Sequence, residues 1–83
     1  MNSKVLENVR SFVKELHEKL VEERTKLDIA WVSLVYSLEK LKDLKDEIEL
    51  NILINCAVNS AEAIVEHAKK ILDMVKELEH KVK

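Results

Sequence analysis

The sequence contains no glycine, no proline and no glutamine, and only three aromatic residues among 83. Without glycine, the chain has no residue that adopts positive φ at little cost. Without proline, it has no enforced break in a helix. Tight β-hairpin turns usually need glycine, often as Asn-Gly or Asp-Gly, and neither dipeptide occurs. These absences argue against a sheet protein and favour long helices.

The residues that are present support the same fold class. Leucine, valine, glutamate, lysine and alanine dominate, and 36% of the residues are charged, which is the composition of long helices and coiled coils. A chain of 83 residues lies near the lower end of what one hydrophobic core can stabilise. We therefore expect residues 1–83 to form a single helical domain.

The charge distribution gives no indication of a nucleic-acid partner. The net charge is −2, and the two halves of the chain are similarly balanced. Residues 1–43 carry eight basic and eight acidic side chains, and residues 44–83 carry six and eight. Nucleic-acid binding requires a basic stripe that neutralises phosphates, and none is present. We expect no nucleic acid among the partners.

The cysteine count and the hydropathy pattern predict a cytoplasmic protein. Cys56 is the single cysteine and cannot form an intramolecular disulfide, which points to a reducing compartment. The first residues lack the apolar core of a signal peptide. The most apolar stretch, residues 50–65, is too polar for a membrane span, because it contains Asn51, Asn55, Asn59 and Glu62.

The C-terminal half has a helical stripe in which apolar residues recur at alternating spacings of four and three. The stripe consists of Leu50, Ile54, Ala57, Ala61, Ile64, Ala68, Ile71, Val75, Leu78 and Val82. Asp46 followed by Glu49 resembles a capping box at the start of a helix. The pattern predicts one helix from about 46 to 82.

In the N-terminal half, apolar residues repeat every seven positions: Leu6, Val13, Leu20, Leu27, Leu34 and Leu41. The polar run 22–26 interrupts the flanks of this row, and Thr25 could cap a new helix there. However, Glu22 and Lys26 form a helix-stabilising pair at four-residue spacing that crosses the supposed break. We predict one helix from about 3 to 42, with a three-helix bundle broken near 24–26 as the alternative.

These two helices predict a long antiparallel hairpin with its turn at about 43–45, a usual length for a helix–helix connection. Folding about position 44 would place Leu27 opposite Ala61 and Leu34 opposite Ile54. Trp31, with Leu38 after it, would lie on the inner flank of the first helix. Apolar residues would then face apolar residues over the whole hairpin.

A hairpin of two helices leaves further apolar residues near the turn uncovered, which indicates an interface. The predicted interface residues are Ile29, Trp31, Val32, Tyr36, Ile52 and Cys56. Dimerisation into a four-helix bundle is the simplest way to cover them. The sequence thus predicts a non-enzymatic homo-oligomeric module for protein–protein interaction or scaffolding, which could also bind another protein.

A second functional hypothesis concerns His17. The segment Glu15-Leu16-His17-Glu18, with Arg10 before it and Leu20 after it, resembles the phosphoacceptor box of histidine-kinase dimerisation domains. Those domains are helical hairpins that dimerise into four-helix bundles. The resemblance implies phosphoryl transfer at His17, with Glu18 as the adjacent acid. The sequence departs from the family where a small or helix-perturbing residue usually follows the box.

No metal or cofactor is predicted. Di-iron bundles use Glu-x-x-His motifs on facing helices. Here the residue three before His17 is Lys14, and the residue three before His67 is Ile64. We therefore assign no catalytic residue and do not expect an enzyme.

Overall fold

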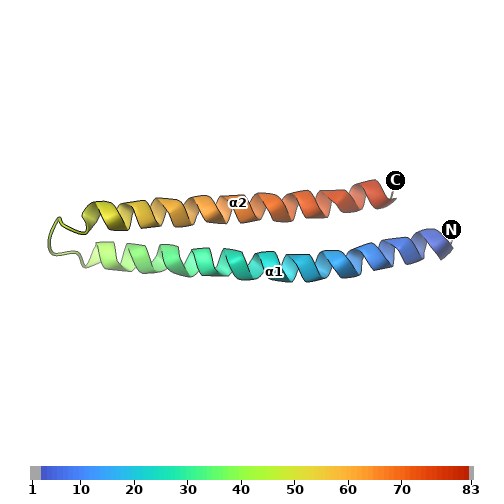
Figure 1. Cartoon of the computed structure of the whole chain (residues 1–83), viewed down its shortest axis with the longest axis horizontal. Coiled ribbons are helices and arrows are strands. Elements are labelled where there is room, and N and C mark those ends of the chain that lie inside the picture. Colours follow the sequence, from blue (N-terminus) through green and yellow to red (C-terminus); the bar gives the residue numbers. More distant parts are fainter. Residues whose placement is uncertain (1–2, 83) are drawn as a thin grey trace.

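The computed structural model describes residues 3–82 and consists of two helices, α1 (Ser3–Lys42) and α2 (Leu50–Val82). The helices run antiparallel along each other and are joined by one connection at the far end from both termini (Figure 1). The molecule measures 66 × 16 × 13 Å. Within residues 3–82 there is no strand. The predicted all-α hairpin is confirmed.

Helix α1 continues without a break through the polar run 22–26. Lys26 Nζ lies 3.9 Å from Glu22 Oε1, so the predicted helix-stabilising pair forms. The Thr25 hydroxyl donates to the carbonyl oxygen of Val21 at 3.1 Å, a bond within the helix rather than an N-terminal cap. The bounds predicted for the first helix are confirmed, and the three-helix alternative is wrong.

Helix α2 begins at Leu50 rather than at the predicted residue 46. The Asp46 carboxylate accepts a hydrogen bond from the Ile48 amide at 2.9 Å, which holds these residues in a turn instead of a helix. The Leu53 amide then donates to the Glu49 carbonyl at 2.9 Å, the first bond of helical type. The connection is therefore longer than the predicted turn at 43–45.

Buried and half-buried side chains mark the seam between the helices. On α1 these are Val9, Phe12, Leu16, Leu20, Glu23, Leu27, Ala30, Leu34, Ser37 and Leu41. On α2 the seam is formed by Leu50, Leu53, Ala57, Ser60, Ile64, His67, Ile71, Met74 and Leu78. Along α2, and along α1 from Leu20 onward, the spacings alternate between three and four. This is the pattern of a coiled-coil seam.

The seam of each helix consists of two rows of residues. One row of each helix is the predicted one, and the other lies one residue before the predicted row. The leucine row of α1 from Leu20 to Leu41, and the α2 row that starts at Leu50, face inward as predicted. The other predicted row is wrong: its members Trp31, Leu38, Ile54, Ala68 and Val75 are exposed, and Ala61 is half-buried. The inward position predicted for Leu6 and Val13, at the start of the leucine row, is also wrong, since both are exposed.

The facing pairs also differ from the prediction. The Ser60 hydroxyl reaches the Ser33 hydroxyl at 2.9 Å, and His67 reaches Glu23. Leu27 was expected opposite Ala61, but this register places it a few residues further along α2. The longer connection displaces the register in this direction, because α2 starts later than expected.

The hairpin has no enclosed core. Among the apolar residues of the described chain, only Leu16 and Ala30 are buried, and no large side chain is fully enclosed. The solvent-accessible surface is 6925 Å², whereas a folded monomer of 9.6 kDa exposes about 5,100 Å². The hairpin therefore exposes about 1,800 Å² more than a compact monomer of its mass.

Ser37 is the most buried polar residue, with 2% of its surface exposed. Its hydroxyl donates to the carbonyl oxygen of Ser33 at 2.9 Å. The substitution Ser37→Leu inserts bulk where the helices meet, and we expect it to lower the free energy of unfolding by about 1–3 kcal/mol. Urea denaturation measures this loss. Ser37→Ala is the control and should change little; equal stability of both variants would contradict tight packing at this position.

Candidate functional site

Two polar pairs cross the seam between the helices. His67 donates from Nδ1 to Glu23 Oε2 at 2.8 Å, and the two side chains are only 16% and 12% exposed. Lys26 Nζ lies 3.6 Å from the other oxygen of Glu23. Ser60 and Ser33 form the second pair, which lies closer to the turn than the first. Sequence periodicity did not predict these contacts, since the partners are 44 and 27 positions apart.

The contacts of Glu23 change its ionisation. The hydrogen bond from His67, helped by Lys26 and Lys70, lowers the pKa of Glu23 below its ordinary value of 4.5. Partial burial acts in the opposite direction. The carboxylate of Glu23 is therefore held in its ionised form within the seam.

This lowered pKa predicts a loss of stability in acid. Because the pKa of Glu23 is lower in the folded state, its ionised carboxylate stabilises the folded protein above pH 4.5. This contribution disappears as the pH falls through the folded-state pKa and the carboxylate is protonated. We expect Glu23→Gln to flatten the decrease in thermal midpoint below pH 4.5. Glu22→Gln is the matched control, since Glu22 is exposed and pairs only across the helix surface. Identical pH profiles for the two variants would contradict this role of Glu23.

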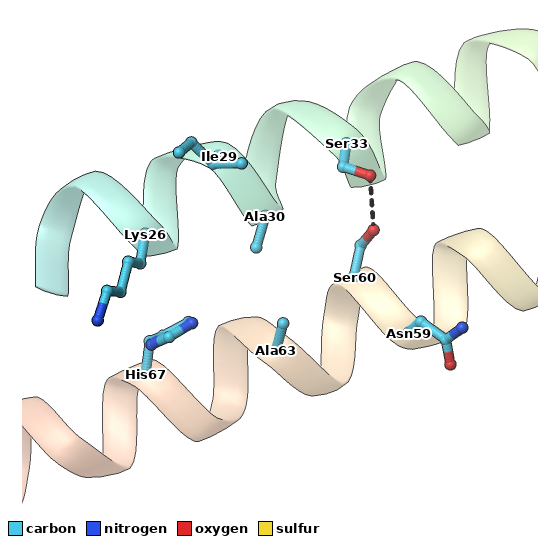
Figure 2. A pocket seen from close by; sticks show the side chains of 8 residues that line it. All are labelled: Lys26, Ile29, Ala30, Ser33, Asn59, Ser60, Ala63 and His67. Carbon is cyan, nitrogen blue, oxygen red and sulfur yellow. Dashed lines mark hydrogen bonds between the residues drawn. The ribbon is translucent and has the colours of Figure 1, made fainter.

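A shallow cleft of about 420 Å³ lies beside these pairs, with Lys26 and His67 at one end and the two serines at the other (Figure 2). It is lined by Lys26, Ile29, Ala30, Ser33, Asn59, Ser60, Ala63 and His67. Ala30 and Ala63 point into the space between the helices (Figure 2), and their small side chains leave it unfilled. The imidazole already bonds a carboxylate and the hydroxyls bond each other, so we interpret the cleft as a gap in packing.

The predicted phosphoacceptor, His17, is exposed on the surface of α1, next to the buried Leu16. His67, which the Glu-x-x-His pattern does not fit, lies in the seam. Over residues 3–82, no group of three histidine, cysteine or acidic side chains is arranged to hold a metal ion.

All six predicted interface residues are exposed, but they lie on two opposite faces. Ile29 lines the cleft, and Trp31 is two residues further, which is about 200° around the helix. We name the side with the cleft the cleft face; its exposed apolar residues are Ile29, Val32, Tyr36, Ile52 and Cys56. Trp31 belongs to the opposite face, together with Val35 and Leu38.

Helix α2 carries a second apolar stripe that sequence analysis did not separate from the first. We name it the outer stripe; its residues are Ile54, Val58, Ala61, Val65, Ala68, Leu72 and Val75. Ala61 is two residues from both Asn59 and Ala63, which line the cleft, so the outer stripe lies on the face opposite the cleft. Its valine, isoleucine and leucine side chains are between 42% and 53% exposed.

Each helix has one uncharged segment in the half of the hairpin near the turn. Residues 29–38 of α1 and residues 50–61 of α2 include no acidic or basic side chain. These segments lie side by side next to the connection (Figure 1). In these segments apolar side chains such as Ile29, Val32 and Ile52 lie outside the seam and are exposed, and exposed apolar patches commonly mark an interface. This region is the strongest candidate for contact with another molecule.

Comparison of the chain with protein-family models, with curated proteins and with solved structures found no match. Within residues 3–82, neither helix has a segment with the length and apolarity needed to cross a lipid bilayer.

Proposed function

We propose that the chain is a homo-oligomeric helical-hairpin module for protein–protein interaction or scaffolding, in which two hairpins associate into a four-helix bundle. The observation that supports this proposal is the apolar surface exposed on two faces of a hairpin that has no enclosed core. Monomeric proteins seldom expose large contiguous apolar patches. A second copy would supply the missing half of the core.

The surface area agrees with this arrangement. A standard protein–protein interface buries about 800 Å² on each partner, and obligate homodimers bury more. The hairpin exposes about 1,800 Å² beyond the surface of a compact monomer of its mass. One dimer interface of standard size would therefore cover less than half of this excess and leave apolar surface available.

That remaining surface supports a role in binding another protein rather than in catalysis. A four-helix bundle made from one face of each hairpin leaves the opposite face open to a partner. The cytoplasm is the compartment we propose, because Cys56 is a single exposed thiol and disulfides rarely form there.

The proposal predicts that folding and association are coupled. The thermal midpoint of an obligate homodimer rises with protein concentration, because association stabilises only the folded state. Circular dichroism melts over a hundredfold dilution series measure this directly. A rising midpoint is the expected result, and a midpoint that does not change with concentration would contradict the proposal.

Phosphotransfer through His17 is a second candidate, favoured by the hairpin fold and by the exposure of His17 on the first helix. The test is incubation with a small-molecule phosphoryl donor, such as acetyl phosphate or phosphoramidate. His17→Gln is the matched control, and His67 and His80 remain in that variant. Acid-labile label that is lost in H17Q would support this function. Absence of label, under conditions in which a histidine-kinase dimerisation domain is labelled, would contradict it.

A further inference from the structure

We propose that the outer stripe of α2 is the self-association seam, and that it packs antiparallel against the outer stripe of a second copy with Val65 near the two-fold axis. The inference rests on the proposed homo-oligomer and adds the face and the orientation. It assigns self-association to one face of the hairpin and leaves the cleft face for a different partner.

The spacing of the outer stripe is that of a seam for another helix. From Ile54 to Val75 the intervals are four, three, four, three, four and three, which is the coiled-coil repeat. All seven positions are apolar, whereas the seam facing α1 contains Ser60 and His67. The stripe is about 32 Å long, and its larger residues are about half exposed in the single hairpin.

The order of side-chain sizes in the stripe indicates a second copy as the occupant. Read in either direction from Val65, the stripe gives a small residue, a large residue and another large residue: Ala61, Val58 and Ile54 on one side, and Ala68, Leu72 and Val75 on the other. A two-fold interface must be complementary to itself. An antiparallel pair centred on Val65 places the alanines of one copy near those of the other, so the two helices can approach closely.

The residues beside the stripe favour the antiparallel orientation. One flank carries Glu62 and Lys69, seven positions apart, while the other flank is formed by the inward row that includes Ile64 and Ile71. Flanking positions of the same kind meet each other across an antiparallel seam, so Glu62 of each copy would lie near Lys69 of the other. Flanking charges of this kind set the orientation of coiled-coil partners. A parallel pair would instead set this charged flank against the apolar flank.

The exposed surface of the hairpin as a whole is large enough for a stable dimer. The surface excess of about 1,800 Å² per chain exceeds the roughly 800 Å² per partner of a standard interface. Trp31, Val35 and Leu38 of α1 lie on the same face as the stripe and extend it near the turn. Aromatic residues such as Trp31 are enriched at the centres of such contacts.

Single-cysteine cross-linking tests the proposal in the full chain. On a Cys56→Ser background, we would prepare Val65→Cys, Val58→Cys and Leu72→Cys and treat each with a mild oxidant and with a short bis-maleimide. Near a two-fold axis a residue meets its own copy, so V65C should form covalent dimers. V58C and L72C should not cross-link alone, but should do so when the two variants are mixed and reannealed.

Each outcome has a defined meaning. Efficient cross-linking of V58C alone and of L72C alone would indicate a parallel seam and overturn the proposal. If every variant sediments as a dimer but none cross-links, the dimer uses another face, which overturns this inference and leaves the proposed homo-oligomer intact. If the unmodified chain is monomeric, both proposals fail. Ile52→Cys on the cleft face is the control and should not cross-link.

Discussion

The substitution Val65→Glu is expected to raise the dimer dissociation constant by at least ~100-fold, because like charges juxtaposed in an interface cost several kcal/mol. The two-fold axis near Val65 would bring the glutamates of both copies together in an apolar seam. Neither charge would have a partner there, and each would lose water. The measurement is sedimentation velocity over a concentration series.

Ile29→Glu provides the matched control for this experiment. Ile29 is 66% exposed and lies on the cleft face, so a charge at this position should leave the dimer intact. If I29E dissociates the dimer and V65E does not, the cleft face is the self-association surface and the assignment of faces is wrong. If both variants dissociate it, the two faces both contribute.

The substitution Leu16→Ala is expected to lower the free energy of unfolding by about 2–5 kcal/mol, the range for a leucine deleted from a packed site. Leu16 is 8% exposed and is the largest buried apolar residue of the hairpin. It lies beside Phe12 of its own helix and Met74 of α2. Removal of its side chain therefore opens a cavity at the one site, among the residues that the structure describes, where a large apolar side chain is buried.

Val13→Ala is the control for this prediction, since Val13 is in the preceding turn and is 42% exposed. Urea denaturation of both variants at one protein concentration separates the two effects. A small loss for V13A and a large loss for L16A is the expected result. Similar losses in both variants would mean that Val13 is covered in the associated protein or that Leu16 contributes less than its burial indicates.

The sequence determined α1 better than α2 because the signals that mark their ends differ in strength. A seven-residue leucine row and the Glu22–Lys26 pair were enough to predict the helix from 3 to 42. The start of α2 was predicted four residues too early. Asp46 is equally suited to cap a helix and to form a turn with Ile48, and the turn is what forms.

The inward row of α2 could not be chosen from periodicity. The row Ile54, Ala61, Ala68, Val75 is more apolar than the true inward row Leu53, Ser60, His67, Met74, so a purely hydrophobic criterion selects the wrong one. The polar members of the true row are satisfied by Ser33 and Glu23 across the seam. Such long-range pairs have no local sequence signal. The same error concealed the outer stripe, because its residues Ile54, Ala61, Ala68 and Val75 were assigned to the seam.

Sedimentation equilibrium of the unmodified chain at micromolar concentration determines whether two hairpins associate. We expect the mass of a dimer, twice the 9.6 kDa of one chain, because the apolar surface outside the seam needs a second hairpin to cover it. A mass of 9.6 kDa that persists as the concentration is raised to the millimolar range would contradict the account.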